Sequence, residues 1–221
     1  MFSLKDAKGP AKLYFDLTQT TFKGLNLIGY KEFDDFFIKQ VEDCLLPFIH
    51  FPQLKNYMEE SSLLLDVGFG GGWPLFILSL LFPEKRVIGL DARKKRVVAV
   101  EEMAKELSCP NIKVFHHRME EVLLDESSFI TFKGVGSVDE CLSLVGSIEP
   151  TYVLFYKGPS FDEQEGDKLN TFLKQNNQWK LIMDEDYELS TSHKRRILLF
   201  HKRKNVPRGT KKDLVRASQL I

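Results

Sequence analysis

The sequence lacks the segments that carry a chain into or across a membrane. None of the apolar runs in its 221 residues approaches the ~18 residues that span a bilayer. The opening stretch, MFSLKDAKGP, has no apolar signal core. The sequence has only three cysteines, Cys44, Cys109 and Cys141, and they are scattered without the spacing of metal ligands. We therefore expect a cytoplasmic, monomeric protein with reduced thiols, no metal site and no membrane partner.

The chain has no net charge, but its charges are unevenly distributed. Lysine and arginine together number 31, as do aspartate and glutamate. From His193 to the end, however, only Asp213 opposes ten basic residues: Lys194, Arg195, Arg196, Lys202, Arg203, Lys204, Arg208, Lys211, Lys212 and Arg216. A basic segment on a neutral protein indicates a polyanionic partner, and nucleic acid is the commonest one. A solvated, partly frayed terminus is the alternative interpretation.

The order of apolar patterns predicts an α/β fold. Residues 11–60 carry apolar residues at helical spacing, whereas seven short β-rich runs follow from Ser62 onward. Between the first five runs lie helix-favouring segments, which predicts a Rossmann-like, mostly parallel seven-stranded sheet covered by helices. The last two runs, WKLIM and RRILLFHK, have no long helix between them and predict an antiparallel hairpin at the sheet edge. We expect a helical N-terminal region at 1–60 and a second domain at 61–221 that ends in a basic tail.

The stretch LLLDVGFGGGWP, residues 63–74, is the first candidate for a binding site. Glycines after the first strand of such a sheet let the backbone approach a ligand closely. A dinucleotide site needs G-x-G-x-x-G, but Trp73 occupies the position of the third glycine. The pattern D-x-G-x-G-x-G, formed by Asp66, Gly68, Gly70 and Gly72, is instead typical of class I methyltransferases that use S-adenosylmethionine (SAM).

Two carboxylates strengthen the SAM interpretation. Asp66 ends the first strand, where a negative charge favours a ligand that carries an ammonium and a sulfonium. Asp91 ends the run RVIGLD, where a carboxylate accepts both ribose hydroxyls of an adenosine. The competing interpretations are an ordinary tight turn for the glycines and a helix N-cap for Asp91.

Over nearly its whole length the sequence resembles the RsmG (GidB) family of bacterial small-subunit rRNA methyltransferases. The matching residues are most closely spaced in DVGFGGGWP and in the following segment FPEKRVIGLDARKKRVVAVEEMAKELSCPNIKVFHHRMEEV. The residues that match the family pattern there are Asp66, Val67, Gly68, Gly70, Gly72, Pro74, Pro83, Glu84, Asp91, Lys95, Arg96, Leu107, Asn111, Arg118, Glu120 and Glu121. Thinner matches lie at Asn26, Leu27, Asp43, Leu45, Lys157, Gly158, Pro207 and Arg208.

The resemblance implies an enzyme that uses SAM to methylate nitrogen-7 of a guanine in 16S rRNA near the decoding site. It implies cofactor contacts at Gly68, Trp73, Met119, Glu120 and Lys133. Trp73 either forms a wall beside the methionine end of SAM or fastens the first helix of the sheet domain to the N-terminal region. The loop at Met119 and Glu120 is expected to contact adenine through its backbone.

No dedicated catalytic base is expected, because nitrogen-7 of guanine has a free lone pair and loses no proton when it is alkylated. Two departures from the family pattern are Lys133 in place of arginine and Phe69 in place of threonine. They leave a second hypothesis open, a non-catalytic RNA- or ribosome-binding protein that keeps the methyltransferase fold.

Overall fold

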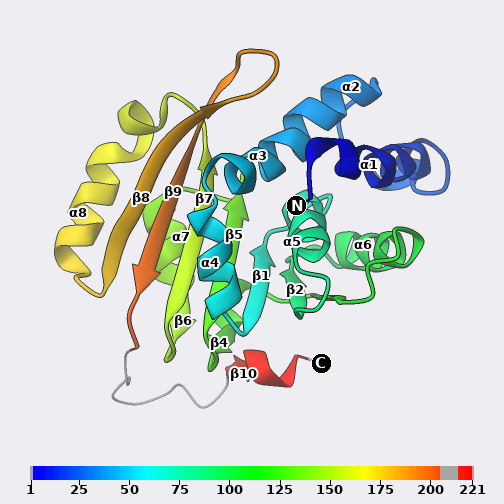
Figure 1. The fold of residues 1–221 in the computed structure, drawn as a ribbon. Coiled ribbons are helices and arrows are strands. Elements are labelled where there is room, and N and C mark those ends of the chain that lie inside the picture. Colours follow the sequence, from blue (N-terminus) through cyan, green and yellow to red (C-terminus); the bar gives the residue numbers. More distant parts are fainter. Residues whose placement is uncertain (1, 205–213, 221) are drawn as a thin grey trace.

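The computed structural model describes residues 2–204 and 214–220, which form a three-layer α/β arrangement (Figure 1). A seven-stranded sheet has the strand order β3-β2-β1-β5-β7-β9-β8. The first five strands in this order run parallel, and β9 is antiparallel to both of its neighbours. The strands are β1 (Leu63–Val67), β2 (Val87–Leu90), β3 (Ile112–Phe115), β5 (Ser128–Lys133), β7 (Thr151–Lys157), β8 (Trp179–Glu188) and β9 (Lys194–Lys202). The predicted fold class and the edge hairpin are confirmed.

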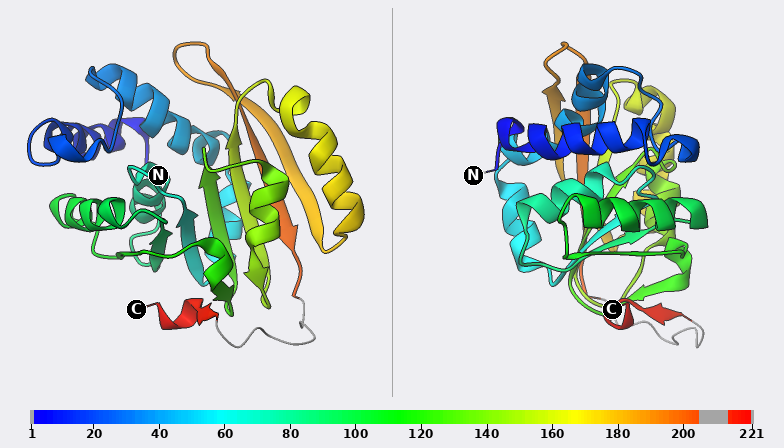
Figure 2. Two further views of the ribbon diagram at one scale, coloured as in Figure 1. Left: turned by 180° about the vertical axis from the view of Figure 1, so that it is seen from behind. Right: turned by 90° about the vertical axis from the view of Figure 1, so that its right-hand side faces the viewer.

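Helices cover both faces of the sheet because alternate strand residues point to opposite sides. Leu64 belongs to a core shared with α4, α5 and α6, whereas Leu63 and Leu65 belong to a second core shared with α7 and α8. Figure 2 shows α7 on the rear face of the sheet, beside α8. These helices are α4 (Gln53–Glu60), α5 (Trp73–Leu81), α6 (Lys94–Glu106), α7 (Val138–Leu144) and α8 (Asp167–Gln175), the last preceded by a π-helical turn at Asp162–Gly166.

The N-terminal helices lie at the end of the sheet where the parallel strands finish (Figures 1 and 2). Helix α1 (Leu4–Gln19) begins earlier than the apolar pattern indicates, because Ser3 and Asp6 form a capping box. The remaining elements of this region are a 3₁₀ helix at Lys23–Leu25, α2 (Phe33–Phe36), a π-helical stretch at Phe37–Glu42 and α3 (Asp43–His50). None of the helices in the described ranges is both long and apolar enough to cross a membrane.

A second, three-stranded sheet was not predicted. Its order is β10-β4-β6, and its strands are β4 (Val122–Leu124), β6 (Gly146–Ser147) and β10 (Val215–Arg216). Ser218 follows β10 and binds Asp125 through both its amide and its hydroxyl. The described C-terminal residues therefore lie at the opposite end of the main sheet from α1 (Figure 1).

Candidate functional site

The loop from β1 to α5 has the backbone conformation that the glycine pattern predicts. Gly68, Gly70 and Gly72 have φ values of +68°, +57° and +90°, which disfavour residues with a side chain. A Cβ atom at Gly68 would lie 2.6 Å from a methyl group of Val135. At Gly70 the nearest atom outside the loop, a guanidinium nitrogen of Arg96, would be 3.7 Å away, which is an ordinary contact distance without a clash.

The N-terminal region closes this loop into a cavity of about 590 Å³. The hydroxyl of Tyr14, on α1, donates a hydrogen bond to the carbonyl of Gly71 at 2.8 Å. Residues 27–30 form the outer wall, which sequence patterns did not indicate. The lining residues are Leu27, Ile28, Gly29, Tyr30, Gln40, Asp66, Gly68, Phe69, Gly70, Gly71, Trp73, Pro74, Arg96, Lys133 and Gly134.

Asp66 lies in this cavity but is almost fully enclosed, with 1% of its surface exposed. One carboxylate oxygen accepts the amide of Leu75 at 3.1 Å, in the first turn of α5, and the other accepts the hydroxyl of Thr131 at 2.8 Å. Burial outweighs these hydrogen bonds and raises the pKa of Asp66 from 3.8 to about 7. A cation brought into the cavity would therefore favour ionisation of this group.

Asp91 holds the glycine loop in place from the end of β2. Its carboxylate accepts the amides of Gly70 at 3.1 Å and Arg93 at 2.8 Å. Arg96 lies 3.6 Å from the same carboxylate and joins it to the cavity lining. Asp91 is not the N-cap of α6, because Arg93 occupies that position. The bond to Gly70 places Asp91 directly beside the cavity.

Trp73 has one of the two roles considered from the sequence, and the other, a wall beside SAM, stays a prediction. Its ring packs against Tyr14, Phe36 and Phe76 at centroid distances of 5.2 to 5.7 Å, which fastens α5 to α1 and α2. The same residue also lines the cavity. Its indole nitrogen is a buried donor without an acceptor among the described residues.

Met119 and Glu120 occupy a 3₁₀ turn after β3 and are not among the described residues that line the cavity. The side chain of Met119 is 2% exposed and packs into the core beneath α7 and α8. Glu120 is exposed to solvent. The expected backbone contact from this turn to adenine stays a prediction.

Lys133 lines the cavity, but its charge is directed to Asp43 at the start of α3. The ammonium lies 3.0 Å from one carboxylate oxygen of Asp43, and Arg195 from β9 donates two hydrogen bonds at 2.8 and 3.1 Å. Tyr187 adds a hydroxyl donor at 2.6 Å. Burial opposes ionisation of Asp43, but the charges of Lys133 and Arg195 outweigh it and lower the pKa of this carboxyl group. This cluster ties the helical region to the sheet.

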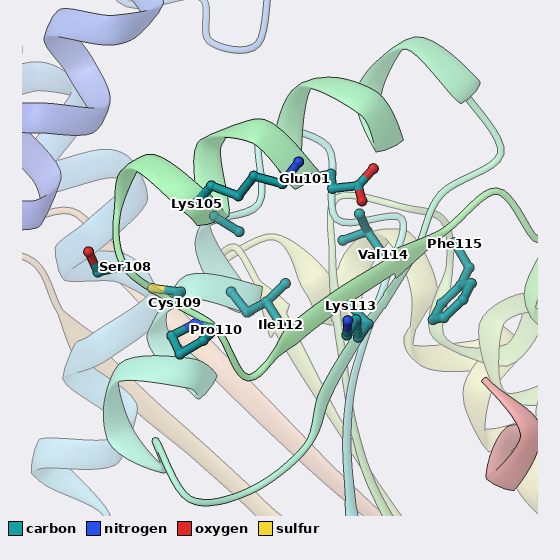
Figure 3. Close-up of a pocket in the computed structure, with 10 residues that line it drawn as sticks. Glu101, Lys105, Ser108, Cys109, Pro110, Ile112, Lys113, Val114 and Phe115 are labelled. Carbon is teal, nitrogen blue, oxygen red and sulfur yellow. The ribbon is translucent and has the colours of Figure 1, made fainter. Parts of the chain in front are cut away.

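A smaller cavity of about 380 Å³ adjoins the first and shares Lys133 and Gly134 with it. Lys157, at the carboxyl end of β7, forms an ion pair with Glu165 at 2.7 Å on its wall. Figure 3 shows a separate hollow of about 560 Å³ between α6 and the outer strand β3, which includes Cys109 and Lys113. It contains none of the predicted site residues, so the functional site is assigned to the two adjoining cavities.

The basic tail is largely neutralised within the described residues. Arg195 and Arg196 bind Asp43 and Asp184, while Lys204 and Arg216 bind Glu149 and Asp125. Lys202 is 6% exposed, and burial lowers the pKa of its ammonium. Pro207, Arg208, Lys211 and Lys212 lie outside the described residues. The cations of the tail that the structure describes are thus mostly engaged in the fold, contrary to the expectation that they are free to grip a polyanion.

Two solved structures share this architecture. A magnesium protoporphyrin IX methyltransferase from Synechocystis PCC 6803 with bound SAM superposes with a TM-score of 0.57 and 13% identity, over 87% of this chain and 97% of that chain. A ribosomal protein L11 methylase from Lactobacillus delbrueckii subsp. bulgaricus gives 0.51 and 15%, over 75% and 79%. The fold is that of class I SAM-dependent methyltransferases.

Relatives found by sequence identify the family of this chain more specifically than the shared fold does. The profile described as GidB, rRNA small subunit methyltransferase G, matches residues 8–190. The ribosomal RNA small subunit methyltransferase G of Thermotoga neapolitana is 31% identical over 189 residues, which cover 82% of this chain and 78% of the relative. That of Lactiplantibacillus plantarum is 27% identical over 207 residues, covering 89% and 82%. The resemblance deduced from the glycine loop and its flanking segments is confirmed, and the chain belongs to the GidB family of ribosomal RNA small subunit methyltransferases.

Proposed function

We propose that this protein transfers a methyl group from SAM to nitrogen-7 of a guanine in 16S rRNA, near the decoding site. The observation that carries the proposal is the convergence of Asp66, Gly68, Gly70 and Trp73 on one cavity, in a chain of this family. Its volume of about 590 Å³ lies within the usual range of small-ligand sites.

The residues present fit SAM. No atom outside the loop lies closer than 3.7 Å to the Cβ position of Gly70, and Trp73 lines the same cavity. The raised pKa of Asp66 indicates a carboxylate whose burial outweighs its hydrogen bonds and the charge of Lys133, and an ammonium or sulfonium would add favourable charge beside it. SAM, when bound, provides an electrophilic methyl group on a positively charged sulfur. We further propose that Asp91 accepts the ribose hydroxyls and that the turn at Met119 and Glu120 contacts adenine through its backbone.

The chain's own residues have to orient the two reactants and exclude water, because nitrogen-7 needs no deprotonation. Residues 27–30 line the cavity together with the glycine loop and take up space beside it. We place the target guanine in the adjoining cavity beside Lys157, because that cavity meets the first at Lys133 and Gly134. The helical region at 1–60 thus completes a site whose floor belongs to the domain at 61–221.

The two departures from the family pattern do not argue for a non-catalytic protein. Phe69 is 4% exposed, and its ring packs 2.7 Å from the position that a Cβ atom on Gly89 would occupy. The ring therefore fills a notch on β2 while the cavity beside it stays open. Lys133 supplies a charge to Asp43, a role that a lysine performs without the two-pronged geometry of arginine.

Mass spectrometry of 16S rRNA from a strain that lacks this gene tests the proposal. We expect the loss of one 7-methylguanosine and its return when the wild-type gene is restored. Unchanged rRNA in the deletion strain would contradict the proposed reaction. Restoration by a Gly70→Val variant would contradict the assignment of the cofactor site.

A further inference from the structure

We propose that the groove between the 3₁₀ helix Lys23–Leu25 and the start of α6 binds the phosphate backbone of the rRNA that carries the target base. The inference rests on the proposed function and adds the RNA-binding surface. The groove has a volume of about 780 Å³ and is lined by Gly24, Leu25, Asn26, Lys94, Lys95 and Val98. We call it the α6 groove.

Charge is the first reason for this assignment. Arg93, Lys94 and Lys95 are consecutive, exposed cations, and within the described part of the chain none of their side chains has an ion pair or hydrogen bond. Lys23, on the facing 3₁₀ helix, is also exposed and unpaired there. The tail, by contrast, uses four of its described cations in ion pairs with acids. Two unpaired cations, Lys94 and Lys95, thus line the α6 groove, and Arg93 and Lys23 are their unpaired neighbours.

The position of these cations on α6 is unfavourable for the helix itself. The N-terminus of a helix carries a partial positive charge, which favours acids and disfavours lysines in the first turn. Helix α6 begins with Lys94 and Lys95 and has no acid in its first turn. Arg96 is offset by Asp91 at 3.6 Å, but Lys94 and Lys95 have no such partner among the described residues. Phosphate groups would supply the missing negative charge.

The rest of the groove also suits a nucleic acid. Leu25 and Val98 are 40% and 53% exposed, and they give the groove apolar surface on which sugars or bases can pack. The groove is next to the cofactor cavity along the chain, since residues 24–26 lead into residues 27–30 and Lys95 precedes Arg96. RNA held here would therefore reach the cavity where the methyl group is proposed to lie.

The test is RNA binding by the double variant Lys94→Gln, Lys95→Gln. Filter binding of a 16S rRNA transcript and of small ribosomal subunits is measured between about 50 and 200 mM salt. We expect at least about tenfold weaker binding at low salt and a log–log salt slope that is smaller by about 1.5, because two phosphate contacts are lost. Calorimetry should give an unchanged affinity for SAM, since neither lysine lines the cofactor cavity.

The matched control is Lys180→Gln, Arg203→Gln. Both residues are exposed and unpaired in the described structure, but they lie near the register pair Thr151–Lys202, where β7 begins, at the far end of the sheet from the cavity. This variant should bind RNA like the wild type. If both double variants lose RNA affinity equally, the loss reflects the overall charge of the protein and the groove assignment fails. If the Lys94→Gln, Lys95→Gln variant (the α6-groove variant) binds RNA with the affinity and salt slope of the wild type, the groove is excluded as the RNA-binding surface.

Methyl transfer by the wild-type protein separates this inference from the proposed function. If the wild type methylates small subunits and the α6-groove variant binds them equally well, only the groove assignment fails. The opposite outcome is that the α6-groove variant loses RNA affinity but the wild type transfers no methyl group. In that case the proposed reaction fails and the groove assignment is retained.

Discussion

Replacing Asp66 by asparagine should make the protein more stable and, at the same time, poorer at binding its cofactor. The substitution removes the charge while keeping both hydrogen bonds. The amide oxygen of asparagine accepts the amide of Leu75, and its NH₂ group donates to the hydroxyl of Thr131. Thr131 can then direct its own proton to the carbonyl of Leu65, which is 3.4 Å away. The variant therefore isolates the effect of the buried charge.

The magnitude follows from linkage. A carboxyl group whose pKa is 3.8 in the unfolded chain and about 7 in the fold favours the folded state while it is protonated, and that stability is lost as the pH rises from about 4 to about 7. At 1.36 kcal/mol per pKa unit, Asp66 costs the fold up to about 4 kcal/mol at pH 8 and about 2 kcal/mol at pH 5. An asparagine at this position has no such cost, so the advantage of the Asp66→Asn variant should grow by about 2 kcal/mol or more between these pH values.

Urea denaturation at pH 5 and pH 8, followed by circular dichroism, measures this difference. Asp34→Asn, at an exposed position on α2, is the control and should change the free energy of unfolding by less than about 0.5 kcal/mol at both pH values. Parallel pH profiles for the wild type and Asp66→Asn would refute the reasoning. Calorimetry at pH 8 should show at least tenfold weaker SAM binding by the variant (roughly 1.4 kcal/mol), and an unchanged affinity would separate Asp66 from the cofactor.

Further predictions concern the ion cluster, the glycine loop, the tail and pH. Asp43→Ala should lower the free energy of unfolding by about 3 kcal/mol, because it leaves two partly buried cations unpaired. Asp35→Ala, at an exposed pair, should cost less than about 1 kcal/mol, and urea titrations compare the two variants. Gly70→Val should abolish SAM binding in calorimetry while the thermal transition persists, since a φ of +57° costs a branched residue only about 1 to 2 kcal/mol. Lys202→Met should leave the salt dependence of RNA binding unchanged in filter assays, because this ammonium is buried over Trp179. SAM affinity of the wild type should rise from pH 6 to pH 8 as Asp66 ionises, and a flat calorimetric profile would contradict its raised pKa.

The sequence predicts those parts of the structure that local patterns determine. Each of the seven main strands is a run of β-favouring residues, and helix α6 shows the amphipathic spacing expected for it. The glycine loop is recognisable because positive φ values require glycine at Gly68, Gly70 and Gly72. The strands β4, β6 and β10 have only two or three residues each, too few for a periodic pattern.

Contacts between distant segments could not be predicted. Lys133 lines the cavity, but its ion pair with Asp43 was not predicted because Asp43 lies in another part of the chain. The basic tail looked free because the acids that neutralise its cations are scattered among α3, β8 and loops. The wall at residues 27–30 has no pattern of its own, and it is the bond from Tyr14 to Gly71 that brings the helical region to the loop.

The most direct test of the central claim is methyl transfer in a purified system. Small ribosomal subunits from a strain lacking the gene are incubated with the protein and SAM, and the 16S rRNA is digested and analysed by mass spectrometry. The account predicts one new 7-methylguanosine per subunit near the decoding site with the wild-type protein, and none with Gly70→Val. A methyl group on another atom or base, or no transfer by a protein that binds SAM, would contradict it.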